Sequence, residues 1–145
     1  MSKLWIGLIS LSAILALWFS GKASIELWKY LKLNASAPAT VSEWSVEQRS
    51  ANVFVISGKY FFDTAGRRWD SSSVLSGHTY PNPYAAQRAI EPLQTQAWQV
   101  WYCQKDPSYS TLQKFFPFKR VFQALIALGV TIYFAGIRFF LVRFA

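Results

Sequence analysis

The sequence predicts an α+β membrane protein, in which two transmembrane helices flank a small, mostly antiparallel β domain with one short helix. Three observations lead to this fold class. Uncharged apolar runs lie between Lys3 and Lys22 and between Arg120 and Arg138. The 145 residues leave room for one modest domain between these runs. In that middle region, apolar and polar residues alternate in the manner of β-strands.

The first segment, residues 1–33, is predicted to hold a transmembrane helix over about residues 4–21. Its apolar run is at the short end of what a spanning helix needs. Trp5 and Trp18 lie near the ends of the run, where indole rings settle at headgroup depth. A cleavable signal peptide is the alternative, but only Lys3 precedes the run, which is longer than the apolar part of a usual signal. A retained anchor is therefore favoured.

The helix is expected to continue beyond Gly21 as an amphipathic extension. Ile25, Trp28 and Leu31 recur at helical spacing among lysines. This apolar stripe would lie on the membrane surface or on the following domain.

The last segment, residues 119–145, is predicted to be the second transmembrane helix. Arg138 and Arg143 near its end can extend their charges to the membrane surface. Small residues on both helices favour a closely packed antiparallel pair, because they let backbones approach. The small residues assigned to this contact are Gly7, Ser10, Ala13, Gly129 and Gly136.

The middle domain, residues 34–118, begins with a predicted linker over 34–40 that contains Pro38. Strands are expected over 40–46 and 52–64, where β-branched and aromatic residues are frequent. A turn at Asp63-Thr-Ala-Gly66 then closes a hairpin, and the alternation continues from Trp69.

A short helix and a final strand complete the predicted domain. Asn82 suits the N-cap and Pro83 the first helical position, and the helix is expected to stop at Glu91. From Gln96 to Cys103 apolar residues alternate again, and this strand is expected to end at Asp106-Pro107.

Charge argues against nucleic acid as a partner. The net charge is +8, but Asn34–Phe118 holds seven basic and six acidic residues and is nearly neutral. The excess lies beside the apolar runs, where basic residues suit anionic headgroups better than a duplex. The charges lean towards a cytoplasmic middle domain without deciding its side.

Two patterns in the middle domain resemble a known family, the small bacterial membrane proteins that carry domain of unknown function thirty-five ninety-two. The first is a hairpin pattern of aromatics, glycine and serine, and the second is a closing pattern around an Asp-Pro turn. The hairpin positions are Tyr60, Phe62, Gly66, Trp69 and Ser71, and the closing positions are Val100, Tyr102, Asp106, Pro107, Ser110 and Leu112. The resemblance implies two helices around a β-rich domain in a bacterial inner or plasma membrane, and it implies no activity.

The residues offer little for catalysis. Cys103 is the only cysteine and His78 the only histidine, and no sequence feature brings them together. A nucleophilic cysteine needs a base or a positive environment. One histidine without an acidic cluster makes no metal site. No catalytic residue, metal or cofactor is predicted.

Surplus aromatic and basic residues indicate a contact surface instead, because exposed aromatic patches usually mark contacts. The residues assigned to membrane or partner contact are Trp28, Arg67, Arg68, Trp98 and Trp101.

Three functions follow, in order of preference. The first is a non-catalytic accessory or interaction module in the membrane, whose partners are the lipid bilayer and another membrane protein or a second copy. The second is a membrane domain that binds or senses a lipid or small ligand. The third, disfavoured, is a membrane-bound enzyme that uses Cys103 and His78, with Asp106 beside them.

Overall fold

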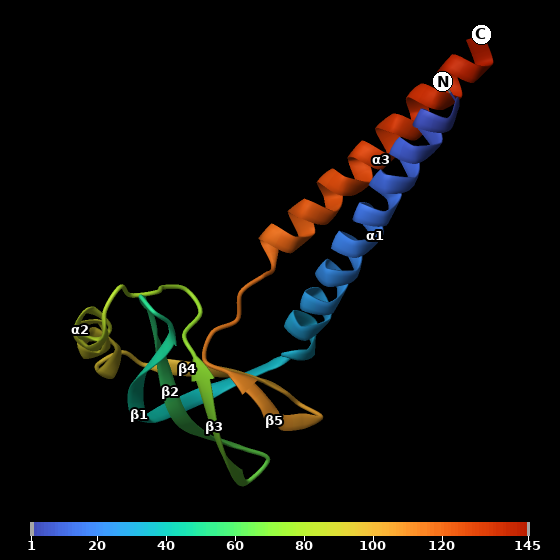
Figure 1. The fold of residues 1–145 in the computed structure, drawn as a ribbon. Coiled ribbons are helices and arrows are strands. Elements are labelled where there is room, and N and C mark those ends of the chain that lie inside the picture. The colour runs from blue at the N-terminus through green and yellow to red at the C-terminus, as the bar shows by residue number, and fades with distance from the viewer. Residues whose placement is uncertain (1, 145) are drawn as a thin grey trace. The chain divides into compact units, whose positions relative to one another are not determined.

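A computed structural model describes residues 2–144 (Figure 1). It has three helices, of which two long apolar ones flank a five-stranded antiparallel sheet. The chain divides into two compact units. The helical unit joins the chain up to Tyr30 with the chain from Phe116, and the β unit is Leu31–Phe115. The predicted α+β architecture is confirmed at this level.

The helical unit contains α3 (Phe118–Phe144) and all but the last two residues of α1 (Ser2–Lys32). The Trp5 and Phe134 rings lie 6.4 Å apart, and Arg120 Nε lies 3.2 Å from Glu26 Oε1. These contacts join the start of each helix to the end of the other, so the two helices run antiparallel. Both are long and apolar enough to cross a membrane.

The predicted helix contact through small residues is mostly wrong. The buried small residues of the pair are Ser12, Ala16, Ala23 and Ala124. A Cβ added at any of the three helix glycines that were assigned to the contact would meet nothing within 4 Å. The helical phase turns those positions outward, so that only Ala13 is half-buried and the exposed ones are Gly7, Ser10, Gly129 and Gly136.

The sheet of the β unit has the strand order β3-β2-β1-β4-β5. Its strands are β1 (Ala35–Ser50), β2 (Val53–Thr64), β3 (Arg67–Val74), β4 (Trp98–Cys103) and β5 (Asp106–Thr111). Strand β1 serves both halves of the sheet, because its first residues pair with β4 and the rest pairs with β2.

The predicted linker over 34–40 is wrong, since Ala35 to Ala39 form a ladder with β4. Alanine and proline are poor strand formers, so local composition hides this strand. The pairing explains it: Ala35 lies opposite Tyr102, and Ala39 lies opposite Trp98. Small side chains on β1 leave room for the large ones on β4.

The chain also forms a strand that the sequence did not reveal. After β4 it turns back into β5, which lies at the sheet edge, where Pro107 is tolerated. The two edges then approach each other, because Leu112 N donates to Ser73 Oγ at 3.3 Å and Ser76 N donates to Gln113 Oε1 at 3.0 Å. The sheet is thereby curled towards a barrel.

The predicted hairpin is confirmed. Thr64 pairs with Arg67 across a two-residue loop, in which Ala65 and Gly66 have φ of 52° and 72°. Positive φ at both positions suits the twist of a tight hairpin.

The short helix α2 (Pro83–Gln94) covers the core of the curled sheet. Asn82 Oδ1 accepts from Ala85 N at 2.7 Å, as an N-cap does. The helix runs through Pro92, three residues past its predicted end at Glu91. Ala86 and Ile90 are its buried residues.

Candidate functional site

Five of the eleven positions of the resemblance motif lie in the core. Tyr60, Phe62, Val100, Tyr102 and Leu112 are all buried, on three neighbouring parts of the curled sheet.

The hydroxyls of two tyrosines in the motif make hydrogen bonds across the sheet. Tyr60 Oη lies 3.0 Å from Ser110 Oγ, and Tyr102 Oη lies 3.0 Å from Thr64 Oγ1. These bonds satisfy buried phenols and tie β2 to β5 and to β4.

The remaining motif positions shape turns and strand edges. Gly66 takes the positive φ of the hairpin, and Asp106 Oδ1 accepts bonds from the Ser108 amide and hydroxyl. Trp69 and Ser71 are half-buried on β3. The motif positions thus lie in the core, the turns and the strands of the β unit.

The structure does not bring the two disfavoured catalytic residues into one site. Cys103 is buried at the end of β4, which confirms its predicted position on a strand. His78 is exposed in the β3–α2 loop. Within residues 2–144, no group of three histidine, cysteine or acidic side chains could hold a metal ion.

The predicted contact residues have different surroundings. Arg67 and Arg68 are exposed beside the hairpin turn, and each stacks on an aromatic ring: Arg67 Cζ is 4.8 Å from the Trp69 centroid, and Arg68 Cζ is 4.5 Å from that of Phe61. Arg68 Nε also lies 3.3 Å from Asp63 Oδ1.

Of the tryptophans assigned to contact, Trp98 has a core role instead. Its ring lies 5.3 Å from that of Trp44, and its Nε1 donates to Leu93 O at 3.0 Å. Trp28 is 63% exposed on α1, and Trp101 is half-buried on β4.

A second group of cations on aromatic rings lies at the two ends of the β unit's chain. Lys32 Nζ is 4.4 Å from the Tyr109 centroid, and Lys114 Nζ is 5.1 Å from that of Trp101. Lys114 Nζ also donates to Leu33 O at 2.6 Å. We call Lys32, Trp101, Tyr109 and Lys114 the lysine–aromatic cluster.

The strand register places the two rings on one face. Trp101 lies opposite Thr111, and Tyr109 is two positions from Thr111 on β5. Residues two apart on a strand share a face, so the rings are diagonal neighbours. The sequence singled out only Trp101 of this group, because the pairing depends on β5, which was not predicted.

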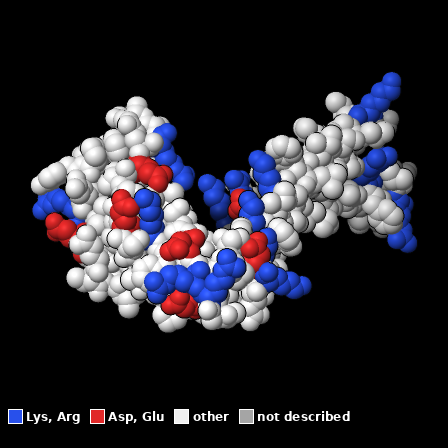
Figure 2. All heavy atoms as spheres, turned by 90° about the horizontal axis from the view of Figure 1, so that it is seen from below, with Lys and Arg blue, Asp and Glu red and all other residues white. Residues whose placement is uncertain are grey.

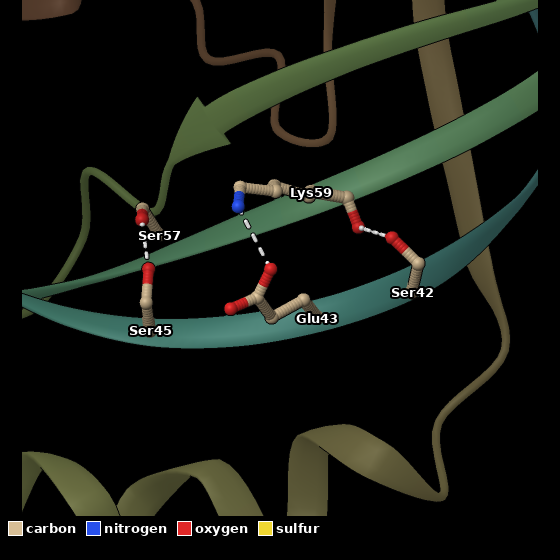
Figure 3. A network of polar contacts seen from close by, with 5 residues as sticks. All are labelled: Ser42, Glu43, Ser45, Ser57 and Lys59. Atoms are coloured by element: carbon tan, nitrogen blue, oxygen red, sulfur yellow. Dashed lines mark hydrogen bonds and ion pairs between the residues drawn. The ribbon is translucent and has the colours of Figure 1, made fainter.

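A polar network lies across β1 and β2 (Figure 3). Lys59 Nζ donates to Glu43 Oε2 at 2.8 Å, and Ser42 Oγ donates to Lys59 O at 3.2 Å. Ser45 and Ser57 hydroxyls lie 2.7 Å apart beside them. The hydrogen bond to Glu43, with its negative charge, holds the pKa of Lys59 above its ordinary value. A lysine kept charged in this way is unsuited to act as a base.

The β unit contains a small cavity of about 90 Å³ beneath α2 and the loop before it. Its apolar lining includes Ile56, Leu75 and Leu93, and His78, Tyr80 and Gln113 contribute polar groups. This volume admits only a few non-hydrogen atoms.

The distribution of charge separates the two units. On the face seen in Figure 2, basic and acidic side chains are mixed over the β unit, whereas the helices are mostly uncharged between basic residues near their ends.

A scan against protein-family models found no match for this chain, and searches of curated proteins and of solved structures found none either.

Proposed function

We propose that this protein is a membrane-anchored, non-catalytic accessory or interaction module, held in a bilayer by α1 and α3. One observation carries the proposal. In the most apolar window of each helix, only 6% and 0% of the residues are buried within the structure. Leu17 is 75% exposed and Ile132 is 70% exposed, and water would solvate such side chains poorly. Lipid chains supply the environment that the fold does not.

Helix length agrees with this proposal. At about 1.5 Å per residue, the 31 residues of α1 extend about 46 Å and the 27 of α3 about 40 Å. A bilayer with its headgroups is about 40–45 Å thick. Each helix therefore suffices for one complete crossing, as expected for an integral protein with two spans.

The non-catalytic role is supported by what surrounds the candidate reactive groups. Cys103 is buried, Asp106 is engaged with Ser108, and Lys59 is paired with Glu43. The proposed partners are the bilayer itself and another membrane protein or a second copy, without nucleic acid or cofactor. Membership of the resembled bacterial family stays a prediction, supported by the core positions of its motif.

The cavity beneath α2 favours a second candidate function, the binding of a small ligand. A mostly apolar lining with a few polar groups is typical of ligand sites. At about 90 Å³ the cavity would accept only a very small molecule.

The proposal is tested by expressing the full chain and extracting the membranes with alkaline carbonate. We expect the protein to stay in the membrane pellet at its full mass, including the first 21 residues. A soluble, monodisperse product made without detergent would contradict the anchor, and loss of the N-terminal segment would instead identify a cleaved signal.

Co-purification in mild detergent separates the first two functions. A stoichiometric protein partner supports the interaction module, and a bound small molecule in the cavity supports the ligand-binding domain. A phenotype that is abolished by Cys103→Ala or His78→Ala would instead support the third function, a membrane-bound enzyme.

A further inference from the structure

We propose that two copies of this chain associate in the bilayer through a groove between α1 and α3, with the Gln123 amides of the two copies hydrogen-bonded to each other. This inference rests on the proposed function, because it requires α1 and α3 to lie in a bilayer. It goes further in naming the partner and the surface that binds it.

The groove lies within the helical unit and has a volume of about 330 Å³. On α3 its residues are spaced at i, i+3, i+4 and i+7, which is one face of a helix. This face extends about 10 Å, so it can accept nearly two turns of another helix. We call it the Gln123 groove; α3 lines it with Gln123, Ile126, Ala127 and Val130, and α1 contributes Leu15 and Phe19.

Gln123 is the residue whose hydrogen bonding the helical unit leaves incomplete. Within residues 2–144, its Oε1 is buried and has no hydrogen-bond partner. The hydroxyls of Ser12 and Thr131 donate to carbonyls of their own helices, at 3.0 and 2.9 Å. Ser20 Oγ is also buried without a partner, but rotation about one bond can bring a serine hydroxyl to such a carbonyl. Gln123 therefore needs its donor from outside the helix pair.

The position of Gln123 along α3 makes this need strong. It lies in the uncharged run between Arg120 and Arg138, one helical turn after Arg120. An amide in hydrocarbon costs free energy unless it is hydrogen-bonded. Lipid chains contain no donor, so they can cover the groove but leave the amide unpaired. Glutamine side chains that bond across helices are one means by which membrane helices associate.

A second copy supplies the matching group. A glutamine amide carries an acceptor and two N–H donors, so two Gln123 side chains can bond reciprocally. Copies that share one orientation are related by a twofold axis along the bilayer normal, which puts both Gln123 residues at the same depth. Gln123 is half-buried, so rotation of its side chain turns the amide towards the groove. Leu15, Ile126 and Val130 are 46%, 52% and 42% exposed and would pack in the same contact.

The test uses the full chain in phosphatidylcholine vesicles, with donor and acceptor fluorophores on an N-terminal tag of separate copies. Energy transfer is measured over a range of lipid-to-protein ratios. We expect Gln123→Leu, which keeps the apolar bulk and removes the amide, to weaken association about threefold to tenfold. In detergent-dispersed monomers this variant should be at least as stable as the wild type, because a buried unpaired acceptor is removed. Weaker association would then not reflect a lost fold.

Ala127→Leu tests the groove itself. The larger side chain occupies the space that the partner helix needs, so we expect association to weaken by about tenfold or more. Gly129→Leu is the matched control, because Gly129 is exposed outside the groove and nothing lies within 4 Å of its added Cβ. It adds apolar bulk to the same helix and should leave the energy transfer unchanged.

Wild-type energy transfer no greater than that of randomly distributed copies overturns the inference. So does association of Gln123→Leu equal to the wild type, or an equal loss in Gly129→Leu. One lipid molecule retained per chain after detergent extraction, without energy transfer in vesicles, would assign the groove to lipid and also overturns it.

Insertion is measured in parallel by alkaline carbonate extraction of the same vesicles. A chain that inserts and stays monomeric contradicts only this inference, whereas a chain that fails to insert contradicts the proposed function.

Discussion

Gly58 is the residue at which the core of the β unit leaves no space. It lies opposite Trp44 in the β1–β2 ladder. A Cβ added there would lie 2.9 Å from Trp44 Cζ3 and 3.4 Å from Leu112 Cδ1. The Trp44 ring is also held against Trp98 at 5.3 Å, so it cannot turn away at low cost. Glycine at this position allows the indole to lie directly on the β2 backbone.

We therefore expect Gly58→Ala to lower the free energy of unfolding by about 1–3 kcal/mol, as overpacking does. Thermal unfolding in mild detergent, followed by near-ultraviolet circular dichroism, measures this. Gly77→Ala is the control, because nothing lies within 4 Å of its added Cβ. It should change the stability by less than about 0.5 kcal/mol. Equal stability of the two variants would show that Trp44 does not pack on Gly58.

The Glu43–Lys59 pair gives a prediction about pH. The hydrogen bond to Glu43 raises the pKa of Lys59 in the folded state. The pair therefore stabilises the fold fully below the unfolded pKa of about 10.4, and this contribution is lost as the pH rises through the higher folded value. Both side chains are more than half exposed, so the effect on stability is small.

Glu43→Ala should return the Lys59 pKa towards its ordinary value, which a carbon-13 NMR titration of labelled lysine can follow. Glu47→Ala is the control, because Glu47 lies opposite Val55 and not opposite Lys59. A Lys59 titration that is unchanged in the Glu43 variant would contradict the pairing.

For individual residues of the β unit, the alternation of apolar and polar side chains was the most informative signal in the sequence. Tyr60 and Phe62 lie two positions apart on β2, Val100 and Tyr102 lie two positions apart on β4, and all four are buried in one core. Side chains alternate with period two along any strand, so the inner face follows from sequence once the strand is recognised. The partners of Lys32 and Lys114 depend on strand register, which no local pattern encodes.

At the scale of elements, the cap of α2 can be tested directly. Asn82 Oδ1 accepts the Ala85 amide at 2.7 Å, which satisfies one of the free amides at the helix start. Asn82→Ala should cost about 1 kcal/mol of unfolding free energy, and Asn82→Ser should restore most of it. The same thermal measurement applies. An alanine variant as stable as the wild type would mean that buried Ala86 and Ile90 hold the helix without its cap.

Elements that follow local rules were predicted, and those that depend on distant partners were missed. The β2–β3 hairpin and the N-terminus of α2 have turn and cap residues that act over a few positions. The start of β1 is rich in alanine and contains proline, and β5 begins with aspartate and proline, all of which are depleted in strands. They become strands because β4 lies between them and supplies hydrogen bonds to both.

For the whole molecule, the sequence predicted two apolar helices around a β-rich centre, because long apolar runs are the clearest signal that a chain carries. The face on which the helices meet was not predictable. Small residues occur all around both helices, and only the structure shows that Ser12, Ala16, Ala23 and Ala124 are the buried ones. Composition determines that a helix can span a membrane, whereas its contact face depends on helical phase.

The last prediction concerns the membrane itself. Ile132 lies near the middle of α3 and is 70% exposed, so Ile132→Asp leaves the fold's own contacts nearly unchanged. An aspartate at the centre of a spanning helix costs about 2.5–3.5 kcal/mol on insertion scales. We expect the variant to be extracted by alkaline carbonate to a much greater extent than the wild type.

Tyr84→Asp is the matched control, because Tyr84 is 69% exposed on α2 in the β unit. It adds the same charge outside the proposed spans and should leave the protein in the membrane pellet. If Ile132→Asp is retained as fully as Tyr84→Asp, then α3 does not lie in lipid, and its exposed apolar surface must be covered by protein.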